Sequence, residues 1–289
     1  MTQIAVLTPD PSDPSYADQW PGVLERLSQA LALEGLQAVP RPWTDHIESG
    51  DELTDFALVL PLIVWGYHRD HARWMQACET WTAAGVRMLN PPSVLAWNSD
   101  KSYLGRLAGR GVAIPPTSWV EGVTQVDVEA AFDRFGTDAL VVKPRVSGGA
   151  WKTLRLSRGE TMQDAPEGPA MIQPYLPSIE TEGETSLLVF GGRLSHVVNK
   201  RPVNGDFRIQ VQFGGQYVAL PEAPEGAWAL AEATLAAIDE DLLYARIDMA
   251  RGADGGWLLM EAELIEPDFY LASAQDGGRN FANAVKARL

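Results

Sequence analysis

The first third of the chain alternates between short apolar runs and segments with helical spacing. Residues 4–8 form an apolar strand, and the unbroken apolar run FALVLPLIVW at 56–65 is typical of a strand that is covered on both faces. Helical spacing predicts helices over 21–35 and 70–85, and VRMLN at 86–90 predicts a further strand, which ends at a pair of prolines. Strands that alternate with helices indicate a parallel α/β domain in this part of the chain.

Beyond the two prolines the pattern changes to that of an α+β protein with antiparallel sheets. A helix is expected from Ser99 to Gly111, followed by a strand, and a second helix at about 226–239. Six further strands are expected in hairpin-like succession, at 139–143, 152–156, 170–173, 185–190, 193–199 and 207–212. Two late strands, YARIDMA and GWLLMEAELIEP, follow the second helix. We therefore predict a domain boundary near residues 91–99.

Composition and charge narrow the classes of function. The chain has 289 residues, and its 38 acidic against 23 basic residues give a formal charge of −15, which argues against non-specific binding to nucleic acid or membrane surfaces. No apolar run approaches the roughly 20 residues that span a bilayer, and the N-terminus lacks the basic start of a signal peptide. Cys78 is the single cysteine, which excludes an intrachain disulfide. We expect a cytoplasmic protein.

One segment, VVKPRVSGGAWKTLRL at 141–156, runs against this acidity. From Lys143 to Arg158 there are five basic residues and no acidic one, around a Ser-Gly-Gly turn. A second basic group lies at 193–208, with Asp206 as its one acidic residue. Because glycine lets main-chain N–H groups approach an anion closely, the hairpin suits phosphate. The simpler alternative is a solvated hairpin turn.

A third cluster has the opposite charge. MEAELIEPDF holds Glu261, Glu263, Glu266 and Asp268 without a basic residue, and Asp248 lies on the preceding strand. Residues two apart on a strand share a face, and two carboxylates on one face repel each other unless a cation lies between them or one is protonated. Mg²⁺ prefers oxygen ligands and commonly keeps substrate phosphates in its shell. Together the three clusters predict a nucleoside triphosphate between basic residues and Mg²⁺, although neither a P-loop nor a GxGxxG motif is present.

The order of these clusters over residues 96–273 resembles the ATP-grasp ligases, and among them the cycloserine synthetases, the ribosomal-protein glutamate ligases and the bacterial glutathione synthetases. The resemblance implies two α+β lobes that sandwich the nucleotide, preceded by a parallel α/β lobe. The implied divisions are an N-terminal substrate-side domain at 1–95, a central lobe at 96–172 and a C-terminal lobe with the magnesium site at 173–289.

Four segments resemble the nucleotide-binding parts of that family. They are the helix NSDKSYLGRLAGRG, the strand and glycine loop VVKPRVSGGA, the interlobe hinge MIQPYL, and the start of the strand TSLLVF. The resemblance assigns the phosphates to two lysines and the glycine loop, adenine to the hinge, and ribose to a glutamate with a second one as its alternative. In that order these residues are Lys101, Lys143, Ser147, Gly148, Gly149, Gln173, Tyr175, Leu176, Glu184 and Glu180.

Three further strings carry the implied chemistry. GDFRIQVQFGG resembles a glutamate-ligase segment and offers Arg208 to the transferred phosphate, with Lys200 as its basic neighbour. ARIDM and MEAEL resemble the two magnesium strands, which gives Asp248, Glu261 and Glu263 as metal ligands. The family's usual metal strand reads Glu-x-Asn, so the second glutamate adds a charge here. LIEPDFYL also replaces the Ser-Pro-Gly turn that helps to hold the acceptor in peptide-forming members, and the glycine loop is short.

The resemblance implies an ADP-forming ligase that uses ATP and Mg²⁺, or Mn²⁺ instead, and joins a carboxylate to an amine through an acyl phosphate. An amino acid or small amino-acid derivative is the first choice of substrate, as in the cycloserine synthetases. A peptide- or protein-modifying ligase, a small-molecule kinase and a non-catalytic nucleotide-binding module are the alternatives, and the three carboxylates argue against the last. Small carboxylate and amine substrates are the expected partners, and a homodimer would be common for the family.

The segment after the apolar run at 56–65 is the candidate substrate wall. In α/β domains ligands bind beyond the carboxyl ends of the strands. We therefore expect the substrate pocket to be lined by Trp65, Tyr67, His68 and Arg69.

Overall fold

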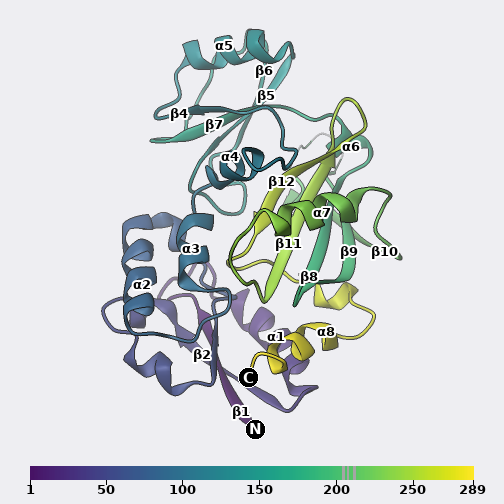
Figure 1. The fold of residues 1–289 in the computed structure, drawn as a ribbon. Coiled ribbons are helices and arrows are strands. Elements are labelled where there is room, and N and C mark those ends of the chain that lie inside the picture. Colours follow the sequence, from purple (N-terminus) through teal and green to yellow (C-terminus); the bar gives the residue numbers. More distant parts are fainter. Residues whose placement is uncertain (204–205, 207, 211–212) are drawn as a thin grey trace.

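The computed structural model describes residues 1–203, 206, 208–210 and 213–289. The described chain forms three β-sheets, with strand orders β2-β1-β3, β4-β7-β5-β6 and β10-β9-β8-β11-β12. In Figure 1 the four-stranded sheet lies at the top, the N-terminal sheet at the bottom, and the five-stranded sheet beside them. The first sheet is parallel and the other two are antiparallel. The predicted combination of α/β and α+β parts is confirmed, whereas the predicted divisions at residues 95 and 172 stay predictions.

The N-terminal sheet is built around β1 (Thr2–Thr8), which pairs with β2 (Leu36–Pro42) and β3 (Leu58–Leu60). Burial of both faces explains the unbroken apolar runs, because the side chains of residues 4–7 are fully buried. The helices of this part are α1 (Trp20–Ala32), α2 (His71–Ala83) and α3 (Pro92–Asn98), with single 3-10 turns at Trp43–His46, Asp51–Asp55 and Tyr67–Arg69.

Two strands predicted for this sheet are shorter in the structure, and one was missed. The predicted strand at 56–65 is limited to Leu58–Leu60, because Pro61 has no amide to continue the ladder. The predicted strand at 86–90 contributes one isolated bridge, between Val59 and Met88. The strand β2 was not predicted, since its sequence LQAVPRP has no continuous apolar run and contains two prolines at the edge of the sheet.

The four-stranded sheet consists of β4 (Ser118–Val120), β7 (Ala170–Pro174), β5 (Ala139–Pro144) and β6 (Leu154–Ser157). One face is covered by α5 (Gln125–Phe135), whose Val128, Ala131 and Phe132 belong to the same core as Val142 and Ile172. This helix was not predicted, although its capping box of Thr124 and Asp127 is a recognisable start signal. The predicted helix from Ser99 begins later, as α4 (Tyr103–Ala108).

The five-stranded sheet consists of β8 (Glu184–Phe190), β9 (Arg193–Arg201), β10 (Gln216–Leu220), β11 (Tyr244–Arg251) and β12 (Trp257–Glu263). The short α6 (Ser178–Thr181) precedes it, and α7 (Ala227–Ala236) packs against β12. Of the strand predicted at 207–212, residues 207, 211 and 212 lie outside the described residues, and 208–210 are in no strand. The edge strand β10 was not predicted.

One apolar core joins the N-terminal sheet to the five-stranded sheet. Ile4 and Leu60 belong to the same buried cluster as Leu188, Phe190 and Phe281. The C-terminal helix α8 (Arg279–Lys286) contacts both α1 and β8. Because of this shared core, side chains from the two sheets can meet at one site.

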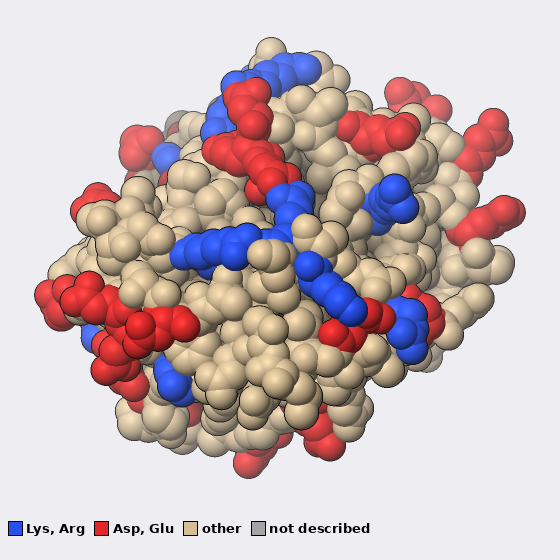
Figure 2. All heavy atoms as spheres, turned by 60° about the horizontal axis from the view of Figure 1, so that its bottom comes forward, with Lys and Arg blue, Asp and Glu red and all other residues tan. Residues whose placement is uncertain are grey.

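Charged side chains of both signs lie on the surface of the molecule. Figure 2 shows one face on which basic and acidic side chains lie in small groups of both signs. In the part of the chain that the structure describes, no helix is long and apolar enough to cross a membrane.

Candidate active site

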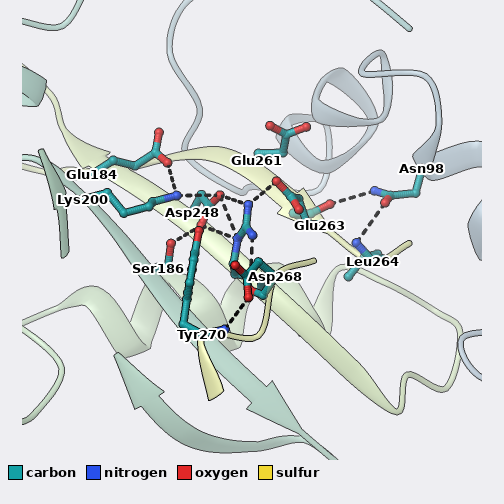
Figure 3. A network of polar contacts seen from close by, with 12 residues as sticks. Asn98, Glu184, Ser186, Lys200, Asp248, Glu261, Glu263, Leu264, Asp268 and Tyr270 are labelled. Carbon is teal, nitrogen blue, oxygen red and sulfur yellow. Dashed lines mark hydrogen bonds and ion pairs between the residues drawn. The ribbon is translucent and has the colours of Figure 1, made fainter. Parts of the chain in front are cut away.

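The centre of the site is a buried lysine, Lys200, between two carboxylates (Figure 3). Its Nζ lies 2.6 Å from Glu184 Oε1 and 3.1 Å from Asp248 Oδ2. The sheet register places these groups together, because Glu184 pairs with Lys200 across β8 and β9, and Asp248 pairs with Ser186 across β11 and β8. The Ser186 hydroxyl donates to Asp248 Oδ1 at 2.5 Å. Lys200, Glu184 and Asp248, predicted separately, thus form one group.

Asp248 and Lys200 stabilise each other's charge, whereas burial raises the pKa of Glu184 although Lys200 opposes this. Burial alone would raise the pKa of Asp248, but Arg246 and Lys200 hold that pKa at about 2. Burial alone would lower the pKa of Lys200, and the carboxylates of Asp248 and Glu184 raise it instead. Lys200 is therefore charged at neutral pH although it is buried in the five-stranded sheet.

Glycine at position 183 is required for this arrangement, because Gly183 precedes β8 with φ at 89°. A Cβ at this position would lie 2.6 Å from the carbonyl oxygen of Lys200. We expect Gly183→Ala to lower the free energy of unfolding by at least about 1 kcal/mol and to weaken ATP binding, because β8 must move away from β9. Urea unfolding and nucleotide titration measure both effects. Gly122→Ala is the matched control, since its Cβ would meet open space and its φ is not positive. Unchanged stability and affinity in Gly183→Ala would contradict the prediction.

Arg246 belongs to the site and was not predicted. It lies on β11 two residues before Asp248, and its Nε and Nη2 are 3.1 Å and 3.0 Å from the Asp248 carboxylate. Its Nη2 also donates to Glu263 on β12, and its Nη1 donates to the carbonyl of Asp268 at 3.3 Å. The guanidinium lies 5.3 Å from the ring centroid of Tyr270. The two-residue spacing within ARIDM is the sequence signal that could have identified it.

A second group ties the glycine loop to β12. The Nζ of Lys101 lies 2.8 Å from Glu261 Oε1 and donates to the carbonyl of Ser147 at 3.1 Å. The main-chain N–H of Lys101 donates to the carbonyl of Arg145, so residues before α4 are held against the loop after β5. Burial lowers the pKa of Lys143, an effect to which Lys101 adds and which Glu261 and Glu184 oppose. The two predicted phosphate lysines thus act on the same carboxylate.

The donor set fits Mg²⁺ that arrives with a nucleotide. Among the described residues, no three His, Cys, Asp or Glu side chains converge closely enough to hold a metal ion. The three predicted ligands, Asp248, Glu261 and Glu263, each have a lysine or arginine partner. Mg²⁺ is commonly bound through one or two carboxylates together with substrate phosphates and water. The carboxylate oxygens present therefore suit a shared metal–phosphate site rather than an all-protein cage.

The predicted hinge and ribose residues have different surroundings. The amide of Tyr175 already donates to the carbonyl of Ala139 at 2.9 Å, and the buried Gln173 side chain donates to Thr117 at 3.0 Å. Leu176 is buried beside them. Glu180 is half-exposed and accepts bonds from Tyr175 and Arg155, at 2.7 Å and 2.8 Å. Glu184, in contrast, is buried beside Lys200 at the centre of the site.

Arg208 lies in a segment only part of which the structure describes. Its guanidinium pairs with Asp206, with Nη2 2.7 Å from Oδ2, and lies 3.7 Å from the ring centroid of Phe213. Gly205 and Phe207, which belong to the same predicted motif, lie outside the described residues. A role of Arg208 on the transferred phosphate stays a prediction.

The predicted substrate wall consists of residues with different environments. Tyr67 is buried, and its ring lies 4.9 Å from that of Trp74. Burial and then Glu266 raise the pKa of its hydroxyl well above the usual range. His68 reaches the glycine loop, because a Cβ on Gly148 would come within 3.1 Å of its Nδ1. Burial lowers the pKa of His68 to about 4, so its ring is neutral at physiological pH.

A loop that was not predicted lies against two of these residues. Arg69 pairs with Asp13 at 2.8 Å and lies 4.7 Å from the ring centroid of Tyr16. The Tyr16 ring in turn lies 5.5 Å from Trp65. The Pro/Asp/Ser-rich segment before α1 therefore folds over the predicted residues, although its composition resembles that of an ordinary surface loop.

Comparison with known proteins shows what the chain as a whole is similar to. Residues 4–90 match the family described as the N-terminal domain of D-cycloserine synthetase DcsG. The chain is 29% identical over 286 residues to the cycloserine biosynthesis protein DcsG of Streptomyces lavendulae, which covers 91% of this chain and 92% of that protein. The crystal structure of D-cycloserine synthetase DcsG aligns with a TM-score of 0.79 and 28% identity over 99% of both chains. The ATP-grasp ligase PsnB, in complex with a precursor variant, Mg and ADP, aligns with a TM-score of 0.67 at 16% identity over 100% of this chain and 99% of that one.

The chain is an ATP-grasp ligase. The resemblance stated from the sequence is thereby confirmed, as is the ADP-forming joining of a carboxylate to an amine. ATP and Mg²⁺ are the cofactors of this ATP-grasp ligase.

Proposed function

We propose that this ATP-grasp ligase acts on an amino acid or a small amino-acid derivative and forms the new bond within that molecule, as a cyclo-ligase. The observation that carries the proposal is similarity to DcsG over nearly the whole chain, including residues 4–90, which contain the predicted substrate wall. The segment LIEPDFYL, in place of a Ser-Pro-Gly turn, supports a substrate smaller than a peptide.

The reaction has two steps. An oxygen of the substrate carboxylate attacks the γ-phosphorus of ATP, the bond to the β–γ bridging oxygen breaks, and ADP leaves. A nitrogen of the substrate then attacks the acyl carbon, the bond from that carbon to the phosphate oxygen breaks, and the nitrogen loses a proton. Charge on the transferring phosphoryl group must be offset in both steps. Mg²⁺, when bound, supplies part of that positive charge.

The lysines of the site supply the rest of the positive charge that the phosphoryl group needs. In this proposal Lys101 and Lys143 face the phosphates together with the loop at 147–149, and Glu184 holds the ribose hydroxyls rather than Glu180. Gln173, Tyr175 and Leu176 flank the adenine, and the main chain of the hinge reads it. Glu184 is favoured because it is buried beside Lys200, whereas Glu180 is already bonded to Tyr175 and Arg155.

The metal and phosphoryl roles fall to the five-stranded sheet. Asp248, Glu261 and Glu263 hold Mg²⁺, and Mn²⁺ can replace it because both ions prefer oxygen ligands. Lys200 and Arg208 contact the transferred phosphate. Arg246 orients Asp248 and Glu263, since it bonds both carboxylates.

The partners in this proposal are small molecules. A carboxylate and an amine of one small substrate occupy the wall of Trp65, Tyr67, His68 and Arg69. No nucleic acid or membrane takes part, the enzyme is cytoplasmic, and a homodimer is its proposed assembly. The strongly acidic composition supports the absence of nucleic-acid and membrane partners.

Phosphate release tests the proposal. Purified protein with ATP and Mg²⁺ is incubated with amino acids singly and in pairs, including O-ureido-serine, and inorganic phosphate is measured. Release with one amino-acid derivative alone is the expected result. Release only with a pair would show that two molecules are joined. ADP formation with a stable phosphorylated product, or no release with any compound, would overturn the proposed reaction.

A further inference from the structure

The glycine loop, defined as residues 145–153 between β5 and β6, lies against the predicted substrate wall at His68. A Cβ added to Gly148 would lie 3.1 Å from Nδ1 and 3.2 Å from Cε1 of His68, so the imidazole ring packs on the main chain of the loop. The centroid of the Trp151 ring lies 6.4 Å from that of His68. The loop proposed for the phosphates and the wall proposed for the substrate are therefore in contact.

His68 is held on the wall by its neighbours in the 3-10 turn at 67–69. The buried Tyr67 ring lies 5.8 Å from the His68 ring and nearly perpendicular to it, at 88°. Arg69, on the other side, pairs with Asp13 at 2.8 Å. Burial lowers the pKa of the His68 ring to about 4, so the ring packs on the loop as a neutral group. The wall thus presents a fixed, uncharged ring to the loop.

The two halves of the loop are held in different ways. In the first half, the main-chain N–H of Lys101 donates to the carbonyl of Arg145 at 2.9 Å, and its Nζ donates to the carbonyl of the buried Ser147 at 3.1 Å. The second half bends through left-handed conformations, with φ at 61° for Ala150 and 50° for Lys152. Such conformations are unfavourable for residues other than glycine and persist only where the surroundings hold them. The contact with His68 lies where the anchored half passes into the strained half.

We propose that His68 is a positioning residue that holds the glycine loop against the wall through its contact with Gly148, so that ATP and the substrate strengthen each other's binding and water is kept from the acyl phosphate. The inference rests on the proposed function, since it couples the two binding places of that reaction. Glycine at position 148 is part of the device, because a Cβ there would force the loop and the ring apart by a few tenths of an ångström.

Loss of the contact has a defined chemical consequence. Water that enters the site attacks the acyl carbon of the intermediate, the bond from that carbon to the phosphate oxygen breaks, and the water gives up a proton. The substrate carboxylate is regenerated, and ATP is spent as ADP and inorganic phosphate without a new C–N bond. Exclusion of water from a reactive intermediate is a common task of loops that close on a bound substrate.

A double-mutant cycle tests the contact by equilibrium binding. The affinity for the non-hydrolysable analogue AMP-PNP is measured with and without O-ureido-serine in wild type, His68→Ala, Gly148→Ala and the double variant. In wild type the substrate should raise the affinity by about 10-fold, and each single substitution should reduce this factor to less than about twofold. Added to His68→Ala, Gly148→Ala should cause no further loss, because the ring that its Cβ would contact is absent.

Product yield is the second measurement, and a purely structural role would not change it. With ATP, Mg²⁺ and O-ureido-serine, wild type should give equal amounts of phosphate and cyclised product, whereas both single variants should release phosphate in excess over product. Gly122→Ala is the matched control, since its Cβ would meet open space. Binding of AMP-PNP in the absence of substrate shows that each variant is folded.

The outcomes separate this inference from the proposed function. If His68→Ala weakens substrate binding but keeps the coupling and the equal yield, His68 only lines the wall and the inference is wrong. It is also wrong if the losses from the two substitutions add. Turnover only with a pair of amino acids would overturn the proposed cyclisation, and the same cycle with that pair would then decide the contact. If no amino acid raises AMP-PNP affinity or phosphate release in wild type, the substrate class and the inference are both wrong.

Discussion

Replacing Glu261 by Gln is expected to lower the rate of phosphate release by about 10²–10³-fold and to leave the fold intact. Burial would raise the pKa of Glu261, but Lys101 and Lys143 lower it below its usual value, so the carboxylate is charged at neutral pH. Glutamine keeps the size and one oxygen but removes that charge. Lys101 would then lose the charge of its partner at 2.8 Å, although the glutamine oxygen could still accept its hydrogen bond, and it would keep its bond to the carbonyl of Ser147.

The measurement is steady-state phosphate release at saturating ATP and varied Mg²⁺. A higher Mg²⁺ requirement in Glu261→Gln would identify the lost charge as a metal ligand, whereas an unchanged requirement would assign it to the lysines and the glycine loop. Glu129→Gln provides the control, because Glu129 is exposed on α5, away from the site. If Glu261→Gln kept more than about a third of wild-type activity, Glu261 would have no role in phosphoryl transfer.

The sequence suggested which residues belong to the proposed site but not how they pair with one another. Alternation along a strand predicts that Glu261 and Glu263 share a face, and the same rule applied to ARIDM would have added Arg246. The contact of Lys200 with Glu184 and Asp248 depends on the order β9-β8-β11, which is a long-range property of the sheet. Local sequence patterns do not encode such an order, because it is decided by which strands bury each other's faces.

The errors in the predicted elements have equally local causes. Apolar composition predicted one long strand at 56–65, but a single missing amide at Pro61 ends it at Leu60. The amphipathic helix α5 was not predicted, although it has a clear start signal at Thr124. Its apolar face is short, because it covers only a small sheet. Tyr16 could not be assigned to the wall, because nothing in a Pro/Asp/Ser-rich loop indicates where it folds.

Arg246, which was not predicted from the sequence, is expected to matter for both stability and activity. Its side chain is 8% exposed and bonds two carboxylates, Asp248 and Glu263, that lie on neighbouring strands. Burial raises the pKa of Glu263, an effect that Arg246 opposes. Without the arginine, Asp248 would keep Lys200 and Ser186, whereas Glu263 would have no cationic partner among the described residues.

We therefore expect Arg246→Met to lower the free energy of unfolding by roughly 3–5 kcal/mol, the cost of removing one partner from a buried ion pair. Phosphate release should fall by at least about 10²-fold, because the two carboxylates lose their fixed orientation. Arg246→Lys keeps the charge but not the planar fork that reaches both carboxylates. It should recover much of the stability and little of the activity. Urea unfolding and phosphate release measure the two effects separately.

The comparison of the two Arg246 variants decides what the arginine contributes. If charge alone mattered, Arg246→Lys would recover stability and activity together, and the geometry of the fork would have no role. If Arg246→Met were as stable as wild type, Asp248 and Glu263 would not need an internal cation, and the carboxylates would already be separated or neutral in the absence of ligand. The expected pattern, stability with lysine and activity only with arginine, requires that one guanidinium hold β11 and β12 in the register that presents both carboxylates to Mg²⁺ and the nucleotide.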